Sequence, residues 1–232
     1  MPAIESKITN VLLERPIGFT VNGRLFYIYP RTIGSSQLIS SLLSVIEYDK
    51  TLLAHATEYE LLRIYKKYPN ECQRIIAYAM LRGRECLDEN KVDDIVSTIK
   101  KIGTADAVTL LCMIISTEPL TDIQQYYGID KELAEYKRVI NAKGAKGTYS
   151  YCGKSIYGTM IATLAEKFGW TMDYIMWGIS IDNIQMLLAD SVKTVFLTEE
   201  EIKKIHPHGS NDDVIRADDP RNTELILSMN WD

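Results

Sequence analysis

The chain has 232 residues, of which 46% are hydrophobic and 25% are charged, a balance typical of globular proteins that bury a core of their own. Its formal net charge of −5 provides no general attraction to the phosphates of nucleic acids or to anionic lipid. The sequence shows neither a secretory signal nor an apolar stretch of about 20 residues, so we expect a cytoplasmic protein with no membrane partner.

The N-terminal region predicts a short helix followed by a β-hairpin. Apolar residues recur at helical spacing within residues 5–14, and Pro16 must end that helix. Two β-rich runs within residues 18–29 then flank Asn22 and Gly23, the pair that best tolerates positive φ at both centres of a type I′ turn. Because an isolated hairpin is only marginally stable in water, we expect its apolar face to pack against the helices that follow.

Helical periodicity continues from residue 32 to residue 140 and predicts a bundle of successive helices joined by short links. The apolar stripes lie within residues 38–46, 52–64, 72–87, 92–102, 105–115, 122–128 and 130–140. The expected fold class is therefore mainly α, a multi-helix bundle with a small N-terminal β-hairpin.

Three further regions follow this bundle. Residues 141–154 contain three glycines and three lysines, a composition that predicts a long exposed loop. Helical patterning then returns in residues 155–192, a Trp-rich helical subdomain, with expected helices over 155–168, 172–177 and 182–189. Residues 193–232 are acidic and interrupted by Pro207, Gly209 and Pro220, so we expect a partly irregular tail. The expected regions are thus 1–140, 141–154, 155–192 and 193–232.

The four cysteines are too widely spaced for a zinc or redox motif, and a buried, reduced thiol is the commonest role for such residues. They are Cys72, Cys86, Cys112 and Cys152. We expect the first three to be structural and Cys152 to be the most exposed.

One loop resembles a phosphate-binding motif, because Gly153, Lys154 and Ser155 precede a predicted helix. A phosphate cradle needs four residues between its glycines, whereas five separate Gly147 from Gly153. The preceding residues, 136–146, also lack the apolar strand that launches such a loop. We therefore interpret the segment as a flexible loop and expect no nucleotide cofactor.

The histidines offer weak candidates for metal binding. His206 and His208 lie near Asp212 and Asp213, and these side-chain types can bind divalent metals. Ordering an irregular acidic tail around a metal is entropically unfavourable, so a solvated tail is the preferred interpretation. No motif places a Ser, His and Asp set either, and we expect no metal site, no catalytic residues and no enzymatic activity.

Tyrosine is unusually frequent, with 14 residues against four phenylalanines, and it combines flat apolar area with a polar edge. Tyr149, Tyr151 and Tyr157 lie near Lys146 and Lys154, a combination that suits a contact surface or the stacking of bases. The acidic net charge argues against nucleic acid. Most tyrosines are expected to line the seams between helices.

Residues 169–190 are dense in large apolar side chains. Trp170 and Trp177 would share one helical face if a single helix joined them. Gly178 is expected to end that helix, and Ser180 or Asp182 to cap the next one. The segment is either a core helical hairpin or a module that docks an apolar partner helix. In the second case, the candidate partner-binding residues are Trp170, Tyr174, Trp177, Ile181 and Met186.

The same segment carries a family resemblance. Its Gly-Trp, Asp-Tyr-Ile and Trp-Gly-Ile sequences precede an apolar helix that ends in Ala-Asp, and with residues 154–159 they resemble the tail assembly chaperones of long-tailed bacteriophages and prophages. Residues 19–30 and 32–34 look like the hairpin that opens such proteins.

The resemblance implies a non-enzymatic protein that binds the tape measure protein, with the tail tube protein as a second partner, in the host cytoplasm. A tape measure protein is a long helical chain with exposed apolar stripes, which a soluble binder could shield. Two alternatives stay open: a structural protein retained in the virion or tail module, and an unrecognised nucleotide-binding enzyme.

Overall fold

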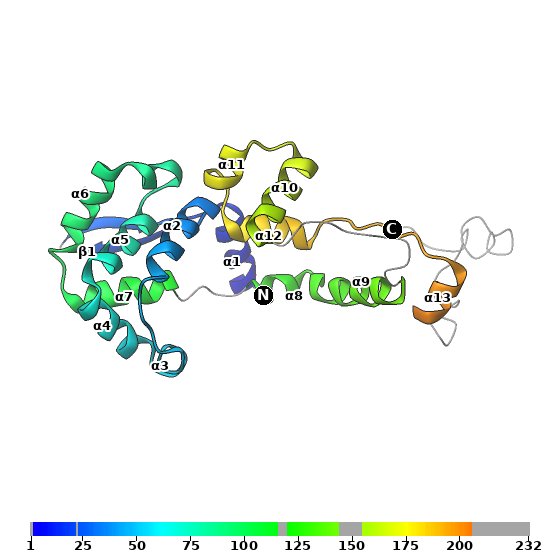
Figure 1. Cartoon of the computed structure of the whole chain (residues 1–232), viewed down its shortest axis with the longest axis horizontal. Coiled ribbons are helices and arrows are strands. Elements are labelled where there is room, and N and C mark those ends of the chain that lie inside the picture. Colours follow the sequence, from blue (N-terminus) through cyan, green and yellow to red (C-terminus); the bar gives the residue numbers. More distant parts are fainter. Residues whose placement is uncertain (1, 22, 116–119, 144–154, 206–232) are drawn as a thin grey trace. The chain divides into compact units, whose positions relative to one another are not determined.

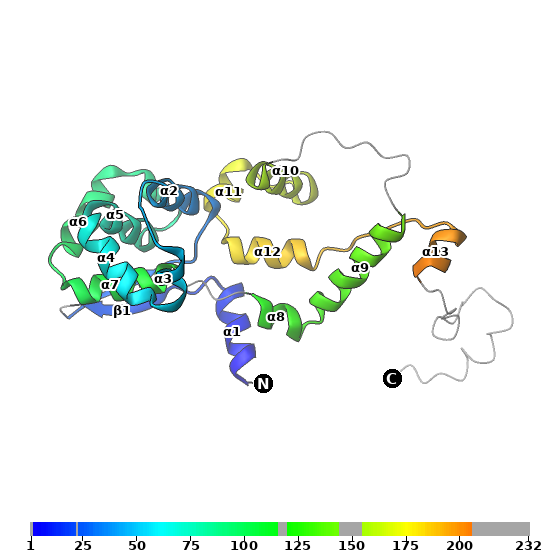
Figure 2. The same cartoon turned by 60° about the horizontal axis from the view of Figure 1, so that its bottom comes forward.

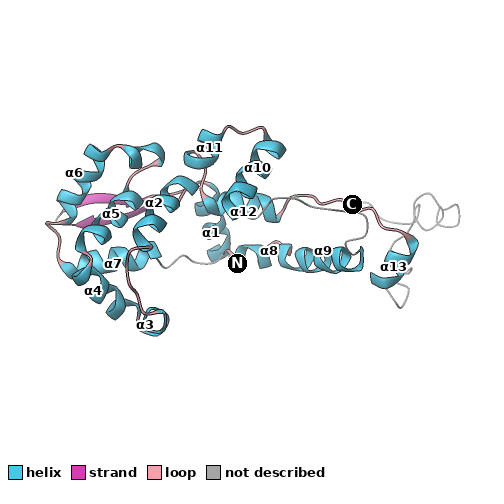
Figure 3. Ribbon diagram, in the orientation of Figure 1, coloured by secondary structure: helices cyan, strands magenta, loops and turns pink. Residues whose placement is uncertain are grey.

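The computed structural model describes residues 2–21, 23–115, 120–143 and 155–205. Helices dominate these residues, and a two-stranded antiparallel sheet lies near the N-terminus (Figure 3). The prediction of a mainly α protein with a small N-terminal hairpin is thus confirmed. No helix in this part of the chain combines the length and the apolarity needed to cross a bilayer.

The chain divides into two compact units. The larger unit comprises residues 1–129 and 151–191, and the smaller unit comprises residues 130–150 and 192–232. Residues 147–154 of the phosphate-loop-like segment and the histidines at 206 and 208 lie outside the described residues.

Two helices form the described part of the smaller unit. They are α9 (Ile129–Lys143), whose first residue belongs to the larger unit, and α13 (Glu199–Ile205). The ammonium of Lys143 donates a hydrogen bond of 2.8 Å to the carbonyl of Phe196, which ties the end of α9 to the segment before α13.

The larger unit begins with a helix and the predicted hairpin. The hairpin pairs β1 (Ile17–Val21) with β2 (Arg24–Ile28) in antiparallel register, with Phe19 opposite Phe26. The two phenylalanine rings stack with centroids 5.8 Å apart, and both pack against the main core.

The hairpin turn and its docking follow from local chemistry. Gly23 has φ of +75°, a conformation that glycine adopts without steric strain, while Asn22 lies outside the described residues. After β2, the N–H of Tyr29 donates a hydrogen bond of 2.9 Å to the carbonyl of Ala79. The hairpin therefore gains its support from a helix of the bundle, as its size requires.

Six α-helices and one 3₁₀ helix form the main bundle (Figure 1). They are α2 (Ile33–Leu43), α3 (Lys50–His55), α4 (Thr57–Lys67), α5 (Pro69–Met80), η1 (Gly83–Leu87), α6 (Glu89–Ile99) and α7 (Thr104–Ile115). Helix α5 is central, because every residue from 75 to 80 is buried and its neighbours include α2, α4, α6 and α7. Cys72 and Cys86 are buried free thiols, as expected.

The predicted helix over residues 72–87 is wrong in its second half. Helix α5 ends at Met80, Leu81 is extended, and Gly83 has φ of +55° before the 3₁₀ turn. A Cβ at Gly83 would lie only 2.9 Å from the carbonyl oxygen of Trp177, so the chain turns here to accommodate a segment distant in sequence. Periodicity cannot reveal such a contact.

The predicted helix over residues 52–64 is likewise two helices, α3 and α4, because Ala56 leaves the helical conformation. The fully buried carboxylate of Glu60 holds the two helices together. It accepts hydrogen bonds from the guanidinium of Arg63 at 2.7 and 2.8 Å, and from the backbone N–H of Asp49 at 2.7 Å. These three donors keep the pKa of Glu60 low, at about 2.

The Trp-rich region forms three helices around a second core (Figure 2). They are α10 (Ile156–Phe168), α11 (Met172–Trp177) and α12 (Ile181–Ala189), close to the predicted ranges. Ser155, Thr171 and Ser180 cap them, each hydroxyl accepting a hydrogen bond from an N–H three residues later. This core centres on Leu164, Ile175 and Ile184, with Ile33 contributed by α2.

The segments around α2 and α12 meet through backbone and side-chain contacts. Thr32 and Ser180 form an antiparallel bridge, and the N–H of Ile181 donates to the carbonyl of Arg31 at 2.8 Å. The indole of Trp177 covers Gly34, where an added Cβ would lie 2.4 Å from a ring carbon. Glycine is thus required at this position for the tryptophan to approach the backbone.

A third apolar cluster completes the larger unit. Helix α1 (Pro2–Leu12) and helix α8 (Thr121–Tyr126) pack through Ile8 and Ile123, and Met186 of α12 contacts the same cluster. These three helices frame the candidate site described below.

We expect Gly34→Ala to lower the stability of the folded protein by roughly 1–3 kcal/mol, because the new methyl group overpacks the contact with Trp177. Thermal unfolding of both proteins measures the effect. Gly103→Ala is the matched control, since a Cβ there would meet only a carboxylate oxygen of Asp106 at an ordinary 3.5 Å. Equal melting temperatures for the two variants would contradict the predicted contact.

The low pKa of Glu60 predicts that the stability of the folded protein depends on pH. Its pKa in the folded state lies below its usual value of 4.5, so its contribution is fully present above pH 4.5 and is lost as the pH falls toward 2. Glu60→Gln should be less stable than the parent at pH 7, and this difference should shrink between pH 4.5 and 2. Chemical denaturation at several pH values measures it, with Glu58→Gln, an exposed position on the same helix, as control. A constant difference would show that the buried carboxylate does not behave as described.

Candidate partner-binding groove

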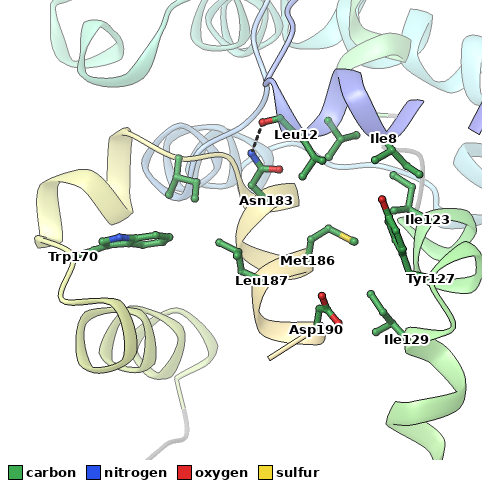
Figure 4. Close-up of a pocket in the computed structure, with 12 residues that line it drawn as sticks. Ile8, Leu12, Ile123, Tyr127, Ile129, Trp170, Asn183, Met186, Leu187 and Asp190 are labelled. Carbon is green, nitrogen blue, oxygen red and sulfur yellow. Dashed lines mark hydrogen bonds between the residues drawn. The ribbon is translucent and has the colours of Figure 1, made fainter. Parts of the chain in front are cut away.

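An open apolar hollow of about 540 Å³ lies between α1, α8 and α12 in the larger unit (Figure 4). Helix α1 contributes Ile8, Val11 and Leu12, and the α8 side contributes Ile123, Tyr127 and Ile129. The opposite wall consists of Trp170, Ile179, Asn183, Met186, Leu187 and Asp190. We call this hollow the groove.

Several groove side chains face solvent. Leu12 is 57% exposed, Tyr127 is 54% exposed and Leu187 is 39% exposed, which is unusual for large apolar groups that line one hollow. Met186 lies between them with its flexible thioether side chain, as Figure 4 shows. A surface of this kind can adapt to an apolar partner.

Trp170 is held at the edge of the groove by other aromatic rings. Its indole stacks on Phe168 with a centroid distance of 4.8 Å and meets the ring of Tyr174 edge-on at 5.2 Å. Gly169, with φ of +66°, ends α10 immediately before it. The indole therefore belongs to a cluster of three aromatic rings and lies between α10 and α11, outside either helix.

The structure separates the five predicted partner-binding residues. Trp170 and Met186 line the groove, and Tyr174 is an exposed neighbour of Trp170. Trp177 points elsewhere, because it packs against the main core over Gly34, and Ile181 packs into the second core. The two tryptophans share no helical face, since α11 begins only at Met172.

Sequence reasoning missed much of the groove. Ile8, Leu12, Tyr127 and Leu187 line it but were not among the predicted site residues. The amphipathic pattern of residues 5–14 gave one signal, because Leu12 and Leu13 extend its apolar stripe beyond what a short helix can bury. No local signal linked that stripe to α12.

A polar contact fixes α12 against the end of α1. One carboxylate oxygen of Glu14 accepts hydrogen bonds from the N–H of Ser180 at 2.7 Å and from the side-chain amide of Asn183 at 3.1 Å. A negative charge at the first turn of a helix is also favoured by the helix dipole. Glu14 has φ of +50° because it ends helix α1: the N–H of Arg15 donates to the carbonyl of Asn10, and the N–H of Glu14 donates to that of Val11, both at 3.0 Å.

Two further charges lie near this helix start. Burial lowers the pKa of the Arg31 guanidinium from its usual value, while Asp182 and Tyr157 oppose that effect. Burial also raises the pKa of Asp182 above its usual value, and the charge of Arg31 partly offsets the rise. Neither group belongs to the lining of the groove, which is mainly apolar.

Among the described residues, no group of three or more His, Cys, Asp or Glu side chains could hold a metal ion. Tyr157 is exposed, whereas the other members of the predicted tyrosine surface lie outside the described residues. The arrangement that the structure does provide is a mainly apolar groove whose lining also includes the polar side chains of Asn183 and Asp190.

Comparison of the chain with models of protein families, with curated proteins and with solved structures found no match.

We expect Glu14→Ala to destabilise the protein by about 1–2 kcal/mol, because Ser180 and Asn183 lose a shared acceptor at the start of α12. Glu14→Gln keeps an oxygen acceptor and should lose less. Glu5→Ala, which removes an exposed carboxylate from α1, the helix that precedes Glu14, is the control. Chemical denaturation of the three variants tests the contact, and a Glu14→Ala protein as stable as Glu5→Ala would contradict it.

Proposed function

We propose that this chain is a non-enzymatic tail assembly chaperone of a long-tailed bacteriophage or prophage, which acts in the host cytoplasm. In this proposal the groove binds an apolar helical stretch of the tape measure protein before the tail is built around it. The tail tube protein is proposed as a second partner.

One observation carries the proposal: an open apolar groove is lined by the segment that resembles these chaperones. Trp170, Met186 and Leu187 belong to that segment, and α1 supplies the facing wall. An amphipathic helix binds a groove of this kind by laying its apolar face against it. Exposed leucine and flexible methionine side chains suit a partner whose apolar stripe varies along its length.

The arrangement of the resembling stretches also supports the proposal. Residues 32–34, which follow the hairpin, lie against residues 177–181 through the Thr32–Ser180 bridge and the contact between Gly34 and Trp177. The two stretches thus form a connected structure, although they lie at opposite ends of the larger unit in sequence. If the tail assembly chaperones have the same contact between these stretches, this would explain why both stretches resemble that family.

The test is co-purification with the tape measure protein encoded in the same tail module, after coexpression in a bacterial cytoplasm. We expect Leu187→Asp to reduce the recovered tape measure protein at least tenfold, because a charge in the groove must be desolvated on binding. Met186→Ala should reduce it to a smaller extent. Both variants should remain folded by circular dichroism.

Val45→Asp is the matched control, since Val45 is also an exposed aliphatic residue of the larger unit, at 60% exposure, and lies outside the groove. Full retention of the tape measure protein by folded Leu187→Asp would reject the groove as the binding site. Recovery of the chain in purified phage particles would instead favour a structural role in the virion.

A further inference from the structure

A second hollow, of about 520 Å³, opens into the main helical bundle and is separate from the groove. Its deep wall is made of core side chains from α4, α5 and α7, including Leu61, Ile75 and Leu111, each about 1% exposed. Its mouth carries the hydroxyl groups of Ser40, Ser44 and Tyr48, which are exposed to solvent. We call it the bundle pocket.

The chemistry of the wall limits what can enter the bundle pocket. No residue of its described lining carries a formal charge, and its deep side chains are aliphatic apart from the thiol of Cys72. Burial raises the pKa of that thiol to about 12, so it is neutral at physiological pH. A charged ligand group would lose its hydration there without gaining a partner of opposite charge.

The deep wall also provides little to hold water. Ordered water in a protein interior needs two to four polar partners, and hollows lined by Leu and Ile stay dry or take up apolar molecules. The hydroxyl groups at the mouth are the polar groups of the described lining. The hydroxyl group of Ser44 already donates a hydrogen bond of 2.7 Å to the carbonyl of Ser41. The size and lining match those of pockets that bind small molecules, which are mostly apolar with a few polar groups at one end.

We propose that the bundle pocket binds an uncharged alkyl compound of medium chain length, with its chain along the half-buried Leu43, Leu53 and Ile115 and a terminal hydroxyl at Ser40 and Tyr48. An alkyl chain fits better than a flat aromatic ring, because the deep wall is aliphatic and offers no aromatic face for stacking. This site is independent of the groove and of the proposed role in tail assembly.

The probe is 1-decanol, added to the purified full chain, with its affinity measured by displacement of a neutral fluorescent naphthylamine dye. We expect 1-decanol to raise the melting temperature, because a ligand that binds only the folded state stabilises it. Affinity should rise about three- to fourfold for each methylene added from 1-hexanol to 1-decanol. Decanoate should bind at least tenfold more weakly, since its carboxylate finds no cation in the lining.

Ser40→Trp places a large side chain at the mouth and should weaken 1-decanol binding at least tenfold. Ser41→Trp is the matched control, because Ser41 is the next residue of the same helix, is also exposed, and does not line the pocket. Ser44→Trp provides a second blocking variant if Ser40→Trp does not fold.

Loss of binding in the blocking variants, with normal binding by Ser41→Trp and Leu187→Asp, would support the proposal. Unchanged binding by both folded blocking variants would overturn it, as would loss of binding in Leu187→Asp, which would locate the ligand in the groove. Decanoate binding as tightly as 1-decanol would overturn the assignment to an uncharged ligand.

Discussion

The contact between the indole of Trp177 and the backbone at Gly34 is the constraint on which the larger unit depends. The ring lies where any side chain at residue 34 would have to be, so α11 can approach α2 only at a glycine. The adjacent Thr32–Ser180 bridge and the hydrogen bond from Ile181 to Arg31 then fix the start of α12. The main bundle and the Trp-rich helices are thereby joined by both packing and backbone hydrogen bonds.

The position of α12 in turn creates the groove. Its first turn is held by Glu14 at the end of α1, and its apolar side meets α1 and α8 through Met186. The positive φ of Glu14 belongs to the hydrogen-bonded turn that ends α1, so the carboxylate that holds α12 lies directly after that helix. Three short elements from distant parts of the sequence thus enclose one apolar surface.

The groove and the bundle pocket differ in a way that separates their proposed ligands. The groove is lined by exposed side chains such as Leu12 and Leu187, which another protein could cover. The bundle pocket has a floor of buried core residues and a described lining without formal charge, which suits a small uncharged molecule.

The sequence alone determined the elements whose signals are local: the hairpin at Gly23, the helices over 155–168, 172–177 and 182–189, and a cap at Ser180 or Asp182, of which the structure has Ser180. Turn chemistry, capping and periodicity act over a few residues, so they can be read directly. Only the tertiary structure decided that the helix over 72–87 breaks before Gly83, that Trp170 and Trp177 face different surroundings, and that Glu14 reaches Ser180. Each of these depends on contacts between residues far apart in the chain, and a one-dimensional pattern carries no record of which distant surfaces meet.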